Sequence, residues 1–109
     1  MKETVRFGGA LMVHVLVRHK VTDYNRWKQA FDSHLNTRKH AGETAFRIFH
    51  IVDDPREVVL FFDWESVEQA RRFMNSDDLR KAMQQAGVEG PPDVQYIEDV
   101  RTVHRSSAD

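Results

Sequence analysis

The stretch VVLFFDWESVEQA, Val58 to Ala70, joins a strand-like run to the start of a helix. Its five leading apolar residues end at an acid and a tryptophan, Asp63 and Trp64. Ser66 followed by Gln69 has the spacing of a capping box, which satisfies free N–H groups of a first helical turn. Neighbouring strand side chains point to opposite faces of a sheet, so Asp63 and Trp64 are not expected to form one catalytic pair. We expect Trp64 to end a core row and Asp63 to lie near water, able to pair with an arginine.

The hydrophobic pattern predicts four strands. Apolar and β-branched runs that are too short for helix cores indicate strands, and they occur at LMVHVLVRH (11–19), TAFRIFHIV (44–52), EVVLFFDW (57–64) and VQYIEDVRTV (94–103). DDPR (53–56) has the composition of a hairpin turn, and EGPPD (89–93) that of a loop.

Two helical segments are expected between these strands. Apolar residues recur every three or four positions from Tyr24 to Leu35, which predicts one helix over 23–41. Thr22 or Asp23 can cap its start, and Gly42 stands where its C-terminus needs a left-handed residue. Helical spacing resumes after Ser66, with a fresh N-terminus at Ser76 and an end at Gly87.

The order strand, helix, strand, strand, helix pair, strand predicts a ferredoxin-like α+β fold, βαββαβ. Right-handed crossovers then give a four-stranded antiparallel sheet with both helical segments on one face. A sheet covered on one side only should alternate apolar and polar residues, yet both faces of these strands are apolar. Leu16 and Phe61, for example, lie opposite the rows that would face the helices. We therefore expect a second copy to cover the other face, in a two-fold dimer of the α+β barrel type.

Length and composition limit the number of domains, the partners and the location that we expect for this protein. Residues 1–9 form a polar leader, 10–103 the single domain, and 104–109 a polar tail. The 109 residues carry 16 basic and 17 acidic side chains and a net charge of -1, which argues against nucleic acid as a partner. The absence of cysteine excludes disulfides and thiolate chemistry. The longest apolar run is far shorter than the ~20 residues of a membrane span and lacks a signal-peptide cleavage site. We expect no membrane partner and a cytoplasmic location.

The consecutive segments FRIFHIVDD (46–54) and PREVVLFFDWESVEQARRFMNSDDLRKAM (55–83) resemble a known family. They are similar to the antibiotic biosynthesis monooxygenase-like branch of the dimeric α+β barrel superfamily, over about residues 11–100. The resemblance implies a ferredoxin-like subunit that pairs as a dimer. It leaves the chemistry open, because this superfamily includes cofactor-independent oxygenases, haem degraders, cyclases, isomerases and proteins of no known activity.

This chain differs in two respects from relatives within that superfamily. The differences bear on whether it binds haem and on whether it is an oxygenase. Haem-degrading relatives carry an iron-ligating histidine in the second helical segment and an asparagine on the first strand. Here the segment DDLRKAMQQ (77–85) offers Met83 and no histidine, and the first strand has no asparagine. Many monooxygenase-type relatives also carry a histidine where this chain has Phe73, which counts against the oxygenase class. We expect no cofactor, and no metal site, since no two histidines have the helical i, i+4 spacing of a metal pair.

His14 and His50 are the candidate catalytic residues, because each interrupts an apolar strand. A neutral imidazole can take a proton near pH 7 without a cofactor. A rigid central strand holds reacting geometry better than a surface position, which ranks His14 first and His50 second. The alternative is a structural or edge histidine with a hydrogen-bonding partner.

Six further residues are candidate substrate-binding groups: Trp27, Phe31, Arg18, Arg47, Phe73 and Met83. The aromatic side chains would wall a pocket, or else form part of the core. The arginines would bind a carboxylate or enolate. Alternatively they form salt bridges, for which Glu98 and Asp99 are available.

Two function classes remain open. One is a small enzyme, a cofactor-free oxygenase, cyclase or isomerase acting on a hydrophobic or aromatic small molecule. The other is a non-catalytic ligand-binding or accessory dimer of the same fold. A histidine or arginine converging on an apolar pocket would favour the enzyme, whereas a filled or purely apolar cavity would favour the binder.

Overall fold

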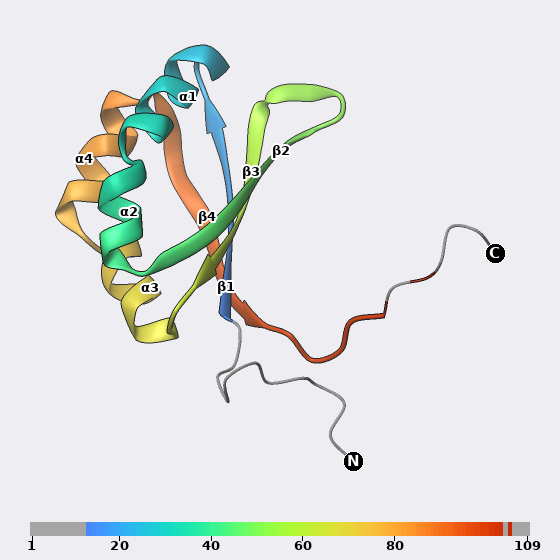
Figure 1. Ribbon diagram of the computed structural model, residues 1–109. Helices are drawn as coiled ribbons and strands as arrows, with labels where there is room; N and C mark the ends of the chain where they lie inside the picture. The colour runs from blue at the N-terminus through green and yellow to red at the C-terminus, as the bar shows by residue number, and fades with distance from the viewer. Residues whose placement is uncertain (1–12, 104, 106–109) are drawn as a thin grey trace.

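The computed structural model describes residues 13–103 and residue 105. Four strands form one antiparallel sheet in the order β2-β3-β1-β4, with β1 at Val13–Val21, β2 at Glu43–Ile51, β3 at Asp54–Trp64 and β4 at Val88–Glu98. The helices lie together on one side of this sheet (Figure 1). The predicted ferredoxin-like α+β fold is confirmed. The predicted leader, residues 1–9, lies outside the described residues, as does the predicted tail except for Arg105.

Strands β1 and β3 form the centre of the sheet and pair over most of their lengths, from Val13 opposite Trp64 to Lys20 opposite Glu57. Their side chains alternate as the sequence predicts. Trp64 is 1% exposed at the end of the helix-facing row, and Asp63 points to the other face. Trp64 therefore belongs to the core and Asp63 to the opposite face of the sheet. Their adjacency in the sequence does not indicate a shared catalytic role.

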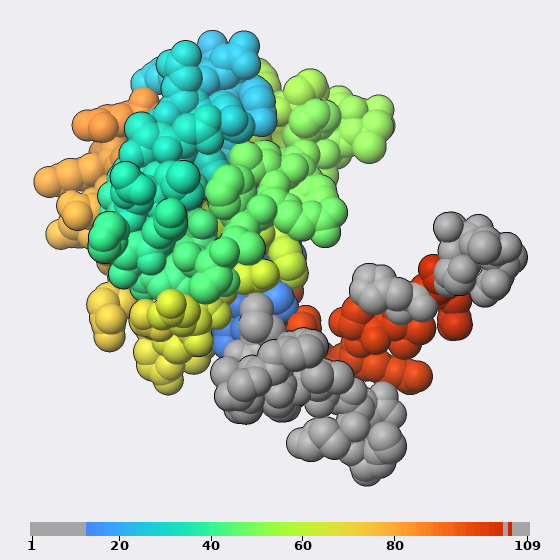
Figure 2. All heavy atoms as spheres, viewed as in Figure 1, coloured from blue at the N-terminus to red at the C-terminus, as the bar shows by residue number. Residues whose placement is uncertain are grey.

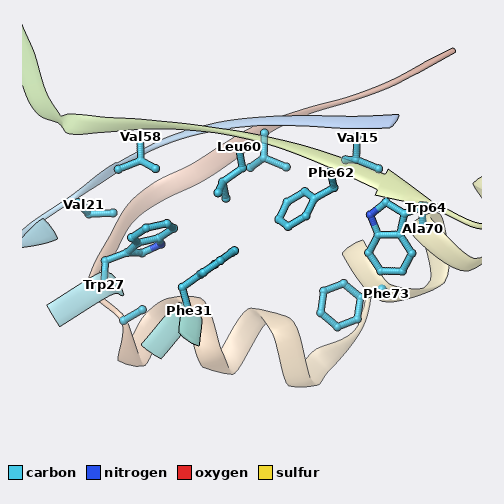
Figure 3. Packing of buried hydrophobic residues seen from close by; sticks show 12 residues of the cluster. Val15, Val21, Trp27, Phe31, Val58, Leu60, Phe62, Trp64, Ala70 and Phe73 are labelled. Atoms are coloured by element: carbon cyan, nitrogen blue, oxygen red, sulfur yellow. The ribbon is translucent and has the colours of Figure 1, made fainter. Parts of the chain in front are cut away.

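The hydrophobic core fills the layer between the sheet and the helices (Figure 3). Trp27 and Phe31 from one helix and Phe73 from another face Leu60 and Phe62 of β3 (Figure 3). Burying side chains of this size contributes roughly 1.5–3 kcal/mol each, so this layer is the main source of stability.

The helices are α1 at Tyr24–Ser33, α2 at Leu35–Ala41, α3 at Val67–Met74 and α4 at Asp77–Gln85. The prediction of one continuous helix over 23–41 was wrong, because the helix breaks at His34. The Phe31 carbonyl accepts hydrogen bonds from the His34 N–H and from Arg38 Nη1. In a continuous helix the Phe31 carbonyl would accept the hydrogen bond of the N–H four residues later. Here the N–H three residues later and the Arg38 side chain bond to it instead.

The predicted caps are confirmed at three helix starts. The Asp23 side chain accepts two backbone N–H bonds at the start of α1. Ser66 Oγ accepts from the Gln69 backbone N–H at 3.1 Å and donates to Gln69 Oε1 at 2.8 Å. At the start of α4, Ser76 Oγ accepts from the Leu79 backbone N–H at 3.2 Å and donates to the Phe73 carbonyl at 2.8 Å. Each cap satisfies N–H groups that the helix itself leaves free.

Two segments predicted as turn and loop belong to strands instead. Ile51 pairs with Asp54, so the hairpin turn is Val52-Asp53 and Pro55 lies inside β3, where the register with β2 shifts. EGPPD, residues 89–93, lies inside β4, beside a register shift against β1. Proline cannot donate to a strand ladder, and it is tolerated at such irregular positions and on an edge strand such as β4. The last strand also ends at Glu98, earlier than the predicted 103.

The face of the sheet opposite the helices carries apolar side chains, as predicted. Leu16, Val59 and Phe61 are half-buried there, and Phe49 and Ile97 are 40% and 38% exposed. None of the described helices covers this face (Figure 1). Figure 2 shows the β2-β3 hairpin and the described segment after β4 projecting from the main body. Within the described residues, no helix is both long enough and apolar enough to span a bilayer.

Candidate functional site

A cavity of about 80 Å³ lies between the sheet and the helices. Its lining is largely aromatic and aliphatic, with Trp27 and Phe31 from α1, Phe62 from β3 and Phe73 from α3. Trp27 and Phe31 are one helical turn apart, so both project from the same face of α1. Their rings stack with centroids 5.0 Å apart. The result is an apolar wall that continues into the core shown in Figure 3.

His19 is a polar group in this apolar lining. It is 6% exposed and lies on the helix-facing side of β1, with its ring edge toward Trp27 at a centroid distance of 5.8 Å. Neither ring nitrogen has a hydrogen-bonding partner among the described residues. Burial lowers the pKa of His19 to about 4, although the charge of Glu57 acts in the opposite direction. The ring is therefore neutral at physiological pH.

Arg38 is the second polar group at the cavity, and it is 3% exposed. Its Nε donates to Glu43 Oε1 at 2.5 Å, and its Nη1 donates to the Phe31 carbonyl at 2.7 Å. The guanidinium lies 3.7 Å from the Phe31 ring centroid. Nη2 is buried without a partner in the part of the chain that the structure describes. We call His19 Nδ1, His19 Nε2 and Arg38 Nη2 the open polar atoms.

Glu43 forms an ion pair with Arg38. It is 5% exposed and begins β2. Burial raises the pKa of Glu43, an effect that the Arg38 charge opposes. Because a guanidinium stays protonated in proteins, it favours the ionised form of the carboxylate bonded to it. The positive charge that Arg38 brings to the cavity lining is therefore matched by the negative charge of Glu43 bonded to it.

The open polar atoms give the cavity specific chemical abilities. A neutral imidazole can accept a proton, and the Nη2 hydrogens can donate to an oxygen on which negative charge develops. A buried donor or acceptor without a partner costs roughly 1–3 kcal/mol. A ligand that satisfies these atoms would recover that cost, so the cavity is a candidate site for one.

Four of the predicted substrate-binding residues meet at this cavity: Trp27, Phe31, Phe73 and Met83. The other candidates lie elsewhere. Arg18 and Arg47 are on the opposite face of the sheet, where Arg18 Nε donates to Glu57 at 2.8 Å and the Arg47 guanidinium lies 4.8 Å from the Phe49 ring centroid. Arg18 thus forms the salt bridge that was its alternative reading, with Glu57 in place of the suggested Glu98 or Asp99.

Neither of the predicted catalytic histidines lines the cavity. His50 is exposed on β2, with Nδ1 3.0 Å from the Ile51 carbonyl oxygen. His14 is 7% exposed on the face away from the helices. Its Nδ1 lies 2.6 Å from Asp63 Oδ1 and its Nε2 lies 2.9 Å from Asp99 Oδ1. Both ring nitrogens are thus engaged by carboxylates, and the ring stacks on Phe61 at 4.6 Å.

His19 and Arg38 were missed as site residues, although the sequence carries a signal for each. Strand alternation places His19 on the same face as Val15, Val17 and Val21, so a histidine in the core row could have been recognised. Arg38 lies two helical turns after Phe31, which places both on one side of a helical segment. Among the described residues, no group of three or more histidine and acidic side chains is placed to hold a metal ion.

No protein-family model matches the chain, and no curated protein matches it in sequence. Solved structures do match its fold. A Bordetella bronchiseptica protein whose name assigns it to the antibiotic biosynthesis monooxygenases has a TM-score of 0.70 at 18% identity, over 84% of this chain and 99% of that one. The fold is therefore that of antibiotic biosynthesis monooxygenase-like structures, as the resemblance implied.

Two further structures with this fold have more informative names. SnoaB, a cofactor-independent oxygenase from Streptomyces nogalater, has a TM-score of 0.65 at 12% identity, over 92% of this chain and 100% of that one. A monooxygenase from the gene ActVA-Orf6 of Streptomyces coelicolor, in complex with Nanaomycin D, has a TM-score of 0.64 at 18% identity. That match covers 88% of this chain and 94% of the other. At these identities the similarity establishes the fold alone.

Proposed function

We propose that this protein binds a hydrophobic ring compound bearing an oxygen substituent in the cavity and oxidises it as a cofactor-independent monooxygenase. The observation that carries the proposal is that His19 and Arg38, whose side chains hold the open polar atoms, line a largely apolar, aromatic cavity together with His34. A filled or purely apolar cavity would favour the non-catalytic binder instead. The names of the two Streptomyces structures support the reaction class.

His19 would act as the general base. In the empty cavity burial holds its pKa near 4, but a developing negative charge beside the ring favours the imidazolium and raises that pKa. Arg38 Nη2 would donate to the ring oxygen as it gains charge, in a site where the apolar wall excludes water. A cyclase or isomerase would use the same proton transfer and return the proton to another atom.

The oxygenase reaction requires dioxygen as the oxidant. Removal of a proton from an acidic ring CH2 group leaves a carbanion whose electrons reduce dioxygen. One oxygen atom becomes a new ring carbonyl, and the other leaves as water with the two hydrogens of the CH2 group. The protein's part is to hold the ring, take the proton and stabilise the charge.

A ring substrate would require the cavity to open. A volume of about 80 Å³ is well below the roughly 300–1,000 Å³ of ordinary ligand pockets. Helix α4 contributes Leu79, Ala82 and Met83 to the lining, and none of its own residues is fully buried. We expect α4 to move outward when a ligand enters, because it has the least buried surface to lose.

The reaction is tested with anthrone, which carries a CH2 group between two aromatic rings and opposite a ketone. Oxygen uptake and the appearance of the quinone are measured at pH 7 against a protein-free control. We expect His19→Gln to lower turnover by about a hundredfold or more, the usual size of an acid–base contribution. His50→Gln, on the exposed part of β2, is the matched control and should leave turnover unchanged.

Full turnover by the His19→Gln protein would remove His19 from the mechanism. Calorimetric binding of anthrone to the unaltered protein without any turnover would favour the competing function, a ligand-binding or accessory protein of the same fold.

We also propose that two copies pair through the sheet face opposite the helices, as a dimer of the α+β barrel type. The proposal is supported by the apolar side chains on that face, which include the exposed Phe49 and Ile97. A large apolar patch on a protein surface commonly marks an interface, and a two-fold axis lets one patch cover its own copy.

A further inference from the structure

The charge of Arg38, a residue of the cavity lining, is balanced by Glu43 before any ligand enters. Arg38 and Glu43 are 3% and 5% exposed, and their side chains are joined by the Nε–Oε1 hydrogen bond of 2.5 Å. A charge buried in such a site is tolerated because it is paired. A ligand that contacts Arg38 therefore meets a cation whose charge Glu43 already compensates.

The remaining charges near the cavity are also unfavourable to a ligand that enters as an anion, whereas negative charge that develops in the proposed reaction is balanced by the imidazolium formed on His19. The negative charges of Asp32 and Glu57 act on Arg38 and His19, respectively. His19 itself stays neutral at physiological pH because burial lowers its pKa to about 4. Among the lining residues that the structure describes, Arg38 is the only lysine or arginine.

The hydrogen-bonding groups of the cavity, in contrast, favour a ligand that carries an oxygen atom. Arg38 Nη2 offers hydrogens to an acceptor, and a neutral His19 offers one donor and one acceptor. A ketone, amide or phenol oxygen satisfies these atoms without adding a charge. A carboxylate would satisfy them too, but it would put a second anion on a guanidinium that Glu43 already shares.

We infer that the cavity selects uncharged oxygen-bearing ring compounds against the corresponding carboxylates, and that Glu43 is the residue that sets this selectivity. The inference rests on the proposed function, since it concerns the ligand of the same cavity. Glu43 acts through Arg38 and through the charge balance, and it has no role in the proton transfer.

The test compares benzamide with benzoate, two probes of nearly the same shape that differ in charge at pH 7.5. Phenol is a third, neutral probe. Binding is measured by isothermal titration calorimetry. In the unaltered protein we expect benzamide and phenol to bind more tightly than benzoate by about tenfold or more, because like charges in a buried site repel strongly.

Glu43→Gln keeps a carbonyl oxygen that can accept from Arg38 Nε but removes the negative charge. We expect it to raise the affinity for benzoate relative to benzamide by about tenfold or more. Glu68→Gln, an exposed charge in the first turn of α3, is the matched control and should leave the ratio unchanged. Melting curves establish that each variant is folded, and Glu43→Met replaces Glu43→Gln if the latter does not fold.

Each outcome has a distinct meaning. Benzoate binding as tightly as benzamide in the unaltered protein overturns the selectivity, whether or not the variants fold, and leaves the proposed function intact. A ratio that does not change in a folded Glu43 variant removes Glu43 as its cause. If neither neutral probe binds at millimolar concentration, the proposed ring-binding function fails together with this inference.

Discussion

Two histidines on one strand illustrate how a single position decides the role of a residue. His14 and His19 both lie on β1, five residues apart, so strand alternation sends them to opposite faces of the sheet. His14 finds Asp63 and Asp99 on either side of its ring. His19 enters the apolar layer beneath the helices, where its nitrogens find no described partner. The histidine that interrupts the apolar pattern most visibly is thus the one whose hydrogen bonds are satisfied.

The buried His19 makes stability depend on pH. Its pKa is about 4 in the folded chain and near 6.5 when solvated, so the unfolded chain binds more protons between these values. The free energy of unfolding therefore falls as the pH drops from 6.5 toward 4. The stability that is lost in this range is fully present above pH 6.5. We expect the unaltered protein to lose ~2 kcal/mol more than His19→Leu between pH 7.5 and pH 5.

Urea unfolding of both proteins at the two pH values gives this difference, and acids that titrate equally in both proteins cancel. NMR titration of the His19 ring measures its pKa directly. A midpoint near 6.5 in the folded protein, or equal pH dependence of the two proteins, would contradict the burial of an unpaired ring.

At the scale of elements, local signals predicted most of the fold correctly. Strand order, the caps at Asp23, Ser66 and Ser76, and the two-sided apolar strands all follow from spacing and residue type. The errors lie where tertiary contacts override local preference. Pro55 signals a turn, yet it lies inside β3, because the strand tolerates proline where the register shifts.

The break between α1 and α2 has the same origin. Helical periodicity runs unbroken through His34, and nothing local signals an interruption there. At this break the Arg38 side chain donates to the Phe31 carbonyl and to Glu43 on the next strand. A contact between residues of different elements is invisible to a reading based on periodicity.

The Ser66 capping box fixes where α3 begins and hence where Phe73 enters the cavity wall. Ser66→Ala removes the acceptor for the Gln69 N–H and the donor to its side chain. We expect the free energy of unfolding to fall by about 1 kcal/mol, the typical value for losing a helix N-cap.

Denaturant unfolding measures this loss. Ser33→Ala, which removes an exposed hydroxyl at the end of α1, is the control and should change stability by no more than about 0.5 kcal/mol. Equal stabilities for the Ser66→Ala and unaltered proteins would show that the cap does not hold α3 in place.

For the whole molecule, the sequence predicted two apolar faces but not which of them forms the site. Alternation sorts strand residues into two sets, and only the packing of the helices shows which set faces a cavity. Arg18, Arg47 and His14 fall on one face, while the aromatic candidates and Met83 meet on the other. The size of the cavity depends on helix packing, which residue spacing does not encode.

The apolar sheet face opposite the helices gives a testable prediction about the proposed dimer. Leu16 lies at its centre on β1, half-buried in a single chain, and would be buried completely if a second copy covered the face. Leu16→Asp should therefore be tolerated by one chain in water, but it would bury an unpaired charge in the dimer. We expect light scattering to give twice the chain mass for the unaltered protein at micromolar concentration. Leu16→Asp should give the mass of a single chain.

Phe61→Asp should act in the same direction, but Phe61 also stacks on the His14 ring, so Leu16→Asp is the cleaner probe. Leu35→Asp, at a 38% exposed position of α2 on the helical side, is the matched control and should remain dimeric. The two substitutions replace the same residue type and add the same charge on opposite sides of the molecule. Two results would show that the apolar face is not the interface. One is an unaltered protein that is monomeric and stable at micromolar concentration, and the other is a Leu16→Asp protein that keeps the dimer mass.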